Sequence, residues 1–515
     1  MSAAADFSAM DSQKFNRFHL KTILVSGVGF YTDALDIFII NLAIPMIAFS
    51  WFFVPGATEP SKASAMPSIV TSLLKASTQV GTLCGQLVFG YLGDKLGRKA
   101  TYGLVLAIMI IASFNTSLAA DTKGFIGIGG MLIFWRLVLG VGIGGDYPIS
   151  AVIASEFASV STRGLMVAAV FSMQGMGILT GCLFSTLLLL ILKPTLQPVD
   201  STTIYVSNFD NVWRILFFIG VLPAIAAVYW RLQVPETPRF SAAKGDHDTA
   251  MKDLSKVMHE IQGSNGGDIS EKYTHITFGQ LFGNWKNGKV LFACAMAWFL
   301  LDVGFYGVQL NQSDILKFIG YAKGATAYEY FLNQSIGNLI LSLCGTVPGY
   351  FFTVALIEKM GRIKIQLMGF GILTAIFVVL TIFYHQMKGT IWLVIAFTAA
   401  NFFFNFGPNT TTFILPAEIF PTKYRSTCHG ISAATGKAGA ILAAFGFDQI
   451  KGKNGENMTT VLAIFTACMI GGFLVTFWVP ETKGKSLEEL GDAFYHPDLV
   501  AQHPAPMVTE KKNKE

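Results

Sequence analysis

The chain has 515 residues, of which 52% are hydrophobic and only 13% are charged, with a formal net charge of +5. A soluble globular protein carries about 25% charged residues, so the composition excludes a soluble enzyme, a disordered chain and a collagen-like protein. The six cysteines form no CxxC pair and no Cys/His cluster, so neither a metal site nor a disulfide framework is indicated. A helical protein with many membrane spans remains.

Apolar segments of spanning length recur along the whole chain. At about 20 residues per span, the length allows about a dozen helices. The first apolar segment is too long for a signal peptide and predicts a retained first span. The twelve expected helices cover 22–53, 67–93, 101–120, 126–157, 165–192, 212–231, 289–311, 329–357, 366–385, 390–416, 427–447 and 459–479.

These spans predict an all-α membrane protein whose twelve helices form two six-helix bundles. The expected parts are an N-terminal segment 1–21, a first bundle 22–231, a central loop 232–288, a second bundle 289–479 and a tail 480–515. Within the central loop, one short amphipathic helix is expected on the face formed by Met251, Leu254, Val257, Met258 and Ile261.

Most Lys and Arg residues lie before the first span, after the last span and in alternate connections, including the central loop. Cytoplasmic loops carry such an excess of positive charge, so both termini and the central loop are expected in the cytosol. The basic net charge is therefore an orientation signal, and no nucleic-acid partner is expected.

Three charged motifs follow corresponding spans in the same order in both halves. Gly93–Lys99 corresponds to Ile357–Lys364, Ser155–Gly164 to Ala417–Arg425, and Pro235–Arg239 to Pro480–Gly484. Two such repeats are typical of transporters that hold their substrate between the halves at mid-membrane. The acid and Arg side chains of these motifs can form a gate that closes in one state, or can act only as topology anchors. The gate candidates are Asp94, Arg98, Glu156, Arg163, Glu358, Arg362, Glu418 and Arg425.

At this point the chain resembles the major facilitator superfamily over all twelve spans. Its Gly-Arg loops and Pro-Glu-Thr ends resemble the sugar-porter-related branch. The resemblance implies a transporter that works by alternating access rather than an enzyme, and no cofactor is expected.

Ionisable side chains inside a span cost at least ~2.5–3.5 kcal/mol each at the centre and usually serve function. Asp33 and Asp36 share one face of the first span, and two close, buried carboxylates allow one of them to hold a proton near neutral pH. A polar pair that caps a bend is the alternative. Asp146 in the fourth span is a second candidate proton site, and Arg136 in the same span is expected to pair with another helix or to pack.

Asp146 follows closely spaced glycines, Gly140, Gly142, Gly144 and Gly145. Such spacing lets a neighbouring helix approach closely. The Gly-x-Gly-x-x-Gly pattern is not read as a dinucleotide loop, because no strand precedes it.

In the seventh span, Trp298, Asp302 and Tyr306 form one stripe of a helix at intervals of four residues. A carboxylate between two aromatic rings indicates a face that lines a cavity, although aromatic stripes are more often packing. Lys437 in the eleventh span needs an anion, which is either Asp302 or a substrate. Gln174 and Asn409 add neutral donors, and for these two amides a helix–helix hydrogen bond is nearly as likely as contact with a substrate.

Such a group suits an anion that keeps a proton. Phosphate retains P–OH donors that an ionised Asp can accept, whereas sulfate is fully ionised and a carboxylate would repel it. Arsenate has the same shape as phosphate and is expected to be poorly excluded. The same side chains would also suit a sugar, so the residues alone leave both substrates open.

The segments around Asp33 and Asp36, Gly144–Ser150, Gln174, Phe406–Phe413 and Pro416–Gly430 resemble the phosphate:proton symporter family, which includes fungal permeases and plant transporters. The resemblance implies proton-coupled phosphate import across the plasma membrane. It assigns substrate binding to Tyr147, Gln174, Trp298, Asp302, Tyr306 and Asn409, proton coupling to Asp33, Asp36 and Asp146, and a functional cation to Lys437. The alternatives are a glycerophosphodiester, organophosphate or sugar transporter of the same fold, and a phosphate receptor with little flux.

Overall fold

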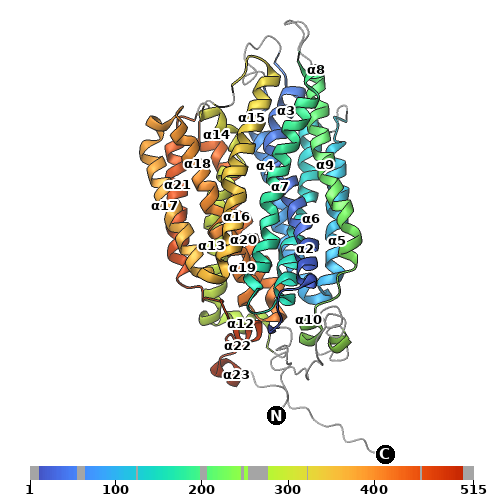
Figure 1. Cartoon of the computed structure of the whole chain (residues 1–515), viewed down its shortest axis with the longest axis vertical. Helices are drawn as coiled ribbons and strands as arrows, with labels where there is room; N and C mark the ends of the chain where they lie inside the picture. Colours follow the sequence, from blue (N-terminus) through green and yellow to red (C-terminus); the bar gives the residue numbers. More distant parts are fainter. Residues whose placement is uncertain are drawn as a thin grey trace, which may run out of the picture.

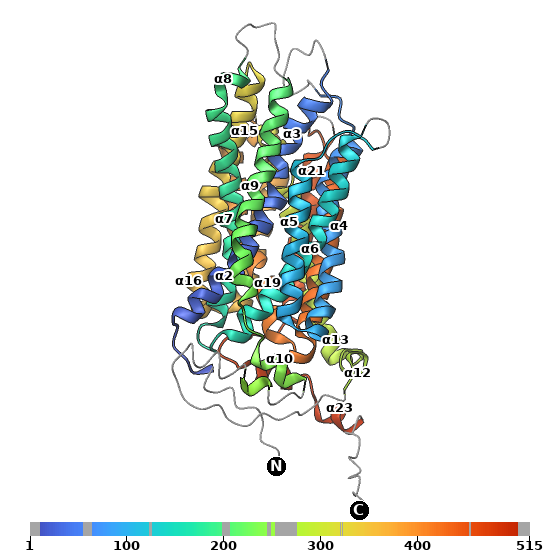
Figure 2. The same cartoon turned by 90° about the vertical axis from the view of Figure 1, so that its right-hand side faces the viewer.

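A computed structural model describes residues 11–54, 64–122, 126–197, 206–244, 249–252, 276–319, 321, 323–452 and 455–502. Long helices run side by side along the long axis, and the described part of the chain contains no named strand (Figure 1). In the view turned by 90°, the short helices α10, α12 and α23 gather at one end of the long helices (Figure 2). This end is called the short-helix end below, and the other is the opposite end.

The first half holds six long helical segments. They are α2 (Arg17–Phe38) continued by α3 (Ile40–Trp51), α4 (Ser68–Leu96), α5 (Arg98–Ser117), α6 (Ile128–Phe157), α7 (Arg163–Ile191) and α9 (Val206–Leu232). The short helix α8 (Lys193–Leu196) follows α7, and α10 (Pro238–Ala243) and α12 (Phe278–Gly283) lie between the halves in sequence.

The second half repeats this arrangement. Its long segments are α13 (Trp285–Gln309), α15 (Ala327–Leu341) continued by the π-helical η2 (Ser342–Thr346) and α16 (Val347–Met360), α17 (Arg362–Met387), α18 (Ile391–Asn405) with α19 (Pro408–Ile419), α20 (Arg425–Ile450) and α21 (Met458–Thr476). Shorter elements are α14 (Gln312–Ile319), the 3-10 turn η3 (Thr422–Tyr424), α22 (Leu487–Asp492) and α23 (Pro497–Gln502).

Each of the twelve expected spans coincides with one of these long segments, so the expected fold is confirmed. Among the described residues, 11 helical segments are long and apolar enough to cross a membrane. The twelfth, α4, is 29 residues long but carries buried Lys75, Gln79 and Gln86. These buried polar side chains lower the mean hydropathy of α4, which packs on α6 and α20.

The two halves meet along two seams related by the repeat. In one seam α4 packs on α20, and in the other α7 packs on α15 and α16. The first seam brings backbones into direct contact, because a Cβ on Gly430 would lie 2.4 Å from the carbonyl oxygen of Gln86. Within the first half, a Cβ on Gly140 would lie 2.1 Å from the carbonyl oxygen of Thr78, as expected for closely approaching helices.

Two long segments of the second half are interrupted near their middle. The π-helical turn η2 precedes Pro348, which lacks an N–H group and disturbs the regular hydrogen-bond ladder. The break between α18 and α19 precedes Pro408, and the freed carbonyl of Asn405 accepts from the hydroxyls of Thr353 and Thr410, both at 2.8 Å. Broken helices of this kind line central sites in transporters.

Of the central loop, residues 253–275 lie outside the described part of the chain. Only Met251 of the expected amphipathic face falls inside it, where its side chain is exposed.

Candidate functional site

A chain of buried hydrogen bonds crosses from the first half to the second. The Gln174 side chain on α7 donates to the Tyr147 hydroxyl on α6 at 2.8 Å and accepts from the Tyr350 hydroxyl on α16 at 2.5 Å. The Asn409 amide on α19 donates to the hydroxyl of Tyr350 and to the side chain of Asn405, both at 2.8 Å. The break before α19 thus places Asn409 in the seam between the halves.

An ion pair lies beside this chain. Lys437 on α20 donates to Asp302 Oδ2 at 3.0 Å and to the Tyr306 hydroxyl at 2.8 Å. Its ammonium also lies 5.3 Å from the centre of the Tyr147 ring, which belongs to the other half. Asp302 Oδ1 is buried and has no hydrogen-bond partner. In this structure, Asp302 is therefore the counter-ion of Lys437.

Aromatic rings enclose the ion pair. Trp298 packs on the bare backbone of α20, since a Cβ on Gly436 would lie 2.5 Å from its indole Cδ1. Phe413 and His429 meet the Trp298 ring edge-on, and Phe413 stacks on Phe171 of the first half at 4.3 Å. The seven site candidates are at most 3% exposed: Tyr147, Gln174, Trp298, Asp302, Tyr306, Asn409 and Lys437.

A second buried ion pair lies within the first half. Arg231 on α9 donates to Asp146 Oδ2 at 2.7 Å, and Ser150 donates to Asp146 Oδ1 at 2.9 Å. The guanidinium also stacks 4.2 Å from the centre of the Tyr102 ring. Asp33 lies within electrostatic range of both members of the pair, and neither of its buried oxygens has a hydrogen-bond partner.

Asp36, unlike Asp33, accepts a hydrogen bond from a side chain. Ser113 on α5 donates to Asp36 Oδ2 at 2.6 Å. Arg136 is fully buried and donates to the backbone carbonyls of Leu74 and Asp36 at 3.2 and 3.4 Å, so it holds helices together as expected. Asp33 is also within electrostatic range of Tyr147 and Tyr306 of the central site.

Gly29→Ala should destabilise the protein by roughly 2–4 kcal/mol, because a new methyl group must displace a buried ion pair. The added Cβ would lie 1.6 Å from Arg231 Nη2 and 2.1 Å from Asp146 Oδ2. We expect a clear drop in the melting temperature of the purified protein. Gly279→Ala is the matched control, because a Cβ there would meet nothing within 4 Å. Equal melting temperatures for the two variants would contradict the importance of this contact.

At the short-helix end, the repeated motifs build two equivalent turns. Gly97 and Gly361 have positive φ values of 105° and 92°, which a residue with a side chain rarely adopts. The two backbone N–H groups after each glycine donate to a glutamate of the Pro-Glu-Thr motif, Glu236 in the first half and Glu481 in the second, at 3.0–3.2 Å. The repeat in the sequence therefore reflects a repeated turn that fixes the Arg residues of both gate motifs.

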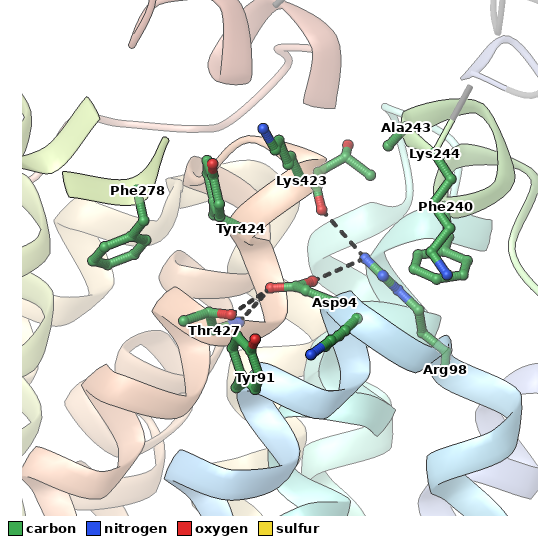
Figure 3. Close-up of a pocket in the computed structure, with 12 residues that line it drawn as sticks. Tyr91, Asp94, Arg98, Phe240, Ala243, Lys244, Phe278, Lys423, Tyr424 and Thr427 are labelled. Carbon is green, nitrogen blue, oxygen red and sulfur yellow. Dashed lines mark hydrogen bonds and ion pairs between the residues drawn. The ribbon is translucent and has the colours of Figure 1, made fainter. Parts of the chain in front are cut away.

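Glu156 connects the halves at this end. It accepts from Arg98 of its own half at 3.1 Å and from Arg425 of the second half at 2.8 Å. Thr237 also donates to it at 2.5 Å. Arg98 reaches the second half too, where it donates to the Thr422 carbonyl at 3.3 Å (Figure 3).

Acidic side chains at the ends of α4 and α16 cap helices of the opposite half. Asp94 accepts from the backbone N–H groups of Ser426 and Thr427 at 3.2 and 2.7 Å, and the contact with Thr427 is drawn in Figure 3. Glu358 accepts from the N–H of Leu165 at 3.1 Å in the equivalent position. A helix N-terminus favours an anion, so both caps stabilise the closed short-helix end.

The remaining gate candidates are also paired. Arg362 donates to Glu418 at 2.7 Å and to Glu358 at 2.9 Å. Arg163 lies 3.4 Å from Asp11 in the segment before α2. Each of the eight gate candidates therefore makes an ion pair at the short-helix end.

The Pro-Glu-Thr ends add a further link. Arg239 on α10 donates to Glu488 on α22 at 2.8 Å and lies 2.9 Å from Asp11. Burial alone would raise the pKa of Glu488, but the Arg239 guanidinium outweighs it and lowers the pKa to about 2. The segments that follow the sixth and twelfth spans are thus tied together.

Arg231 and Tyr350 are members of these networks that the sequence did not indicate. Arg231 lies one residue before the end of the apolar helix α9, so in the sequence it resembles an arginine that anchors a span at the membrane surface. No local sequence pattern predicts that its side chain reaches Asp146. Tyr350 is one aromatic residue among many in its span. Among the described residues, no cluster of three or more His, Cys, Asp or Glu side chains could hold a metal ion.

The sequence pattern of the sugar (and other) transporter family matches residues 22–494. A probable inorganic phosphate transporter of Arabidopsis thaliana is 41% identical over 498 residues, which cover 94% of this chain and 95% of that protein. A repressible high-affinity phosphate permease of Neurospora crassa is 39% identical, over 94% of this chain and 88% of the permease.

Among solved structures, the proton:xylose symporter XylE bound to 6-bromo-6-deoxy-D-glucose superposes with a TM-score of 0.72 at 19% identity, over 93% of this chain and 99% of XylE. That likeness shows the fold of the major facilitator superfamily. Together with the full-length relatives, it establishes that the chain is an integral membrane protein of the sugar (and other) transporter family and belongs to its group of plant and fungal inorganic phosphate transporters.

Proposed function

We propose that the protein imports inorganic phosphate together with protons by alternating access. The observation that carries the proposal is the buried Asp302–Lys437 pair, which lies at the seam of two halves beside a hydrogen-bonded chain of neutral donors. The full-length relatives are named as phosphate transporters or permeases, which supports this substrate.

The site chemistry favours protonated phosphate. Lys437 supplies a positive charge for the anion, and Asp302 Oδ1 is an unused acceptor for a P–OH group. The amides of Gln174 and Asn409 are neutral donors for the other oxygens. A neutral sugar would gain little from the lysine, so the ion pair favours an anionic substrate.

In this proposal, residues 22–231 and 289–479 move relative to each other, while 232–288 links them. The pairs around Glu156 and the two acidic caps close the short-helix end, and they must separate for phosphate to leave there. The closed end would be cytosolic, with both chain termini on that side of the plasma membrane. Arsenate, which has the shape of phosphate, would be carried as well.

Proton coupling follows from the membrane potential. Entry of an anion into a negative cell opposes the field by ~2.3 kcal/mol per charge per 100 mV, so uptake needs more positive than negative charge. For a phosphate monoanion, at least two protons are needed for net positive entry. Asp33, Asp36 and Asp146 are the proposed proton carriers. Asp33 is within electrostatic range of Tyr147 and Tyr306, so a change in its protonation would change the electrostatic potential at the Asp302–Lys437 pair.

The proposal is tested with the full chain in proteoliposomes under an imposed proton gradient, with radiolabelled phosphate outside. We expect accumulation that a proton ionophore abolishes, with a net positive inward current that grows with an inside-negative potential. Competition by excess glycerophosphodiester or sugar but not by arsenate would identify another substrate. Phosphate binding without accumulation would indicate a receptor, and sodium-dependent uptake would contradict proton coupling.

A further inference from the structure

A four-residue charge cluster closes the seam at the end opposite to the short helices. Lys75 lies in the first half on α4, whereas Asp314 on α14 and Asp448 and Lys451 at the end of α20 lie in the second half. Helix α14 marks this end of the molecule in Figure 1. None of these residues belongs to the repeated motifs or to the central site, and these four are called the Lys75 cluster below.

Lys75 makes all its contacts in this cluster across the seam. Its ammonium lies 2.7 Å from the Asn311 side-chain oxygen, 3.4 Å from both oxygens of Asp448 and 3.5 Å from Asp314. Ser72, one turn earlier on α4, donates to Asp448 at 3.0 Å. The side chains of Lys75 and Asp448 are each only 5% exposed, so the contacts are shielded from solvent and gain strength.

The cluster is asymmetric in a way that suits repeated opening. Lys451 lies 2.7 Å from both Asp314 and Asp448, and all three belong to the second half. When the halves separate, Asp314 and Asp448 keep Lys451 as their partner, so neither carboxylate is left without a counter-ion. Only Lys75 loses its partners, and it then becomes hydrated at an opening seam. The cost of leaving a buried charge unpaired is therefore avoided.

We propose that Lys75 and its partners Asp448, Asp314 and Asn311 form the latch that closes the transporter at the end opposite to the short helices. The latch holds the halves together while the central site is enclosed, and its release opens a path to the site from that side. This inference concerns the motion of the halves and does not depend on which substrate is carried.

The latch is not opened by protonation of Asp314. Burial raises the pKa of Asp314, but Lys75, Lys451 and Lys317 outweigh burial and lower the pKa below its ordinary value. Tyr330 on α15 and Asp448, which shares Lys451 with Asp314, are further titratable groups near Asp314. A carboxyl with a lowered pKa stays ionised until the pH falls through that lowered value, so its ion pairs persist in mildly acidic medium. Separation of Lys75 from Asp314 therefore requires a movement of the helices and not protonation of this acid.

The latch is tested by the accessibility of a reporter cysteine in the seam. Gln79 is fully buried and lies one turn from Lys75 on the same face of α4. The Gln79→Cys chain is placed in nanodiscs, where a water-soluble maleimide reaches both membrane faces, and labelling is corrected for the chain without this substitution. Adding Lys75→Ala should raise the labelling rate roughly tenfold, because loss of a buried partner shifts the equilibrium toward the open state.

Three further variants complete the test. Lys75→Arg should keep slow labelling, and Lys323→Ala, the same chemical change at an exposed residue, should have no effect. Asp448→Asn should raise labelling by itself and add little to Lys75→Ala, because both remove one interaction. The proposal is overturned if Asp448→Asn, or a folded Lys75→Ala protein, labels at the parental rate, or if Lys323→Ala raises labelling equally.

Discussion

Asp302→Asn should reduce proton-driven phosphate uptake about 100-fold, since losing one partner of a buried, hydrogen-bonded charge pair in a binding site weakens binding by roughly 2–5 kcal/mol. The amide keeps the volume of the side chain but loses the negative charge that holds Lys437 at 3.0 Å. It also turns one acceptor into a donor, which cannot receive a P–OH proton. Initial rates of radiolabelled phosphate uptake in proteoliposomes measure the effect.

The loss must be separated from a folding defect. Asp498→Asn makes the same chemical change at an exposed residue of α23 and should transport normally. Asp302→Glu keeps the charge and should retain more uptake than the asparagine variant. Removing the stranded cation in Asp302→Asn/Lys437→Ala should recover melting temperature without recovering uptake. Near-normal uptake by well-folded Asp302→Asn protein would refute the role of this carboxylate in binding.

Asp146→Asn should abolish proton-driven accumulation while leaving measurable phosphate binding. The substitution removes a carboxylate that is fully buried and 2.7 Å from Arg231, and it leaves that guanidinium without its ion pair. The central donors around Lys437 are unchanged, so phosphate can still bind. Binding of labelled phosphate to purified protein and uptake under a proton gradient give the two readouts.

A second substitution distinguishes coupling from stability. Leaving Arg231 without its counter-ion should lower the free energy of unfolding by roughly 3–5 kcal/mol, as is typical when one partner of a buried ion pair is removed. Asp146→Asn/Arg231→Gln lacks both charges and should recover most of that loss, yet it should still fail to accumulate phosphate. Accumulation by the double variant would show that Asp146 serves only as the counter-ion of Arg231.

In the proposed mechanism, the two buried pairs connect the two halves with the proposed proton carriers. Lys437 and Asp302 belong to the second half, but the lysine lies over the Tyr147 ring of the first half. Asp33 is within range of that same tyrosine and of the Asp146–Arg231 pair. A change of charge at Asp33 would therefore act on both pairs over a short path through contiguous side chains.

The fold was predictable from the sequence because a bilayer imposes strong rules on local segments. Every backbone polar group in hydrocarbon must be satisfied within its own helix, so each apolar segment of about 20 residues predicts one span. The repeated motifs predicted equivalent halves, and the turns at Gly97 and Gly361 are indeed built alike. The stripe of Trp298, Asp302 and Tyr306 was visible because helical periodicity alone places these residues on one face.

The pairing of charges was decided only by the tertiary structure. Arg231 and Asp146 are 85 positions apart, and Lys437 and Asp302 are 135 apart, on helices whose mutual rotation no local pattern encodes. For the same reason, no local pattern indicates that Lys75 contacts Asp448, which is 373 positions away. Which segments cross the membrane, and which charges they carry, can be read from composition and helical period. Which charges meet across the seams depends on how rigid helices pack, and packing is a property of the whole bundle.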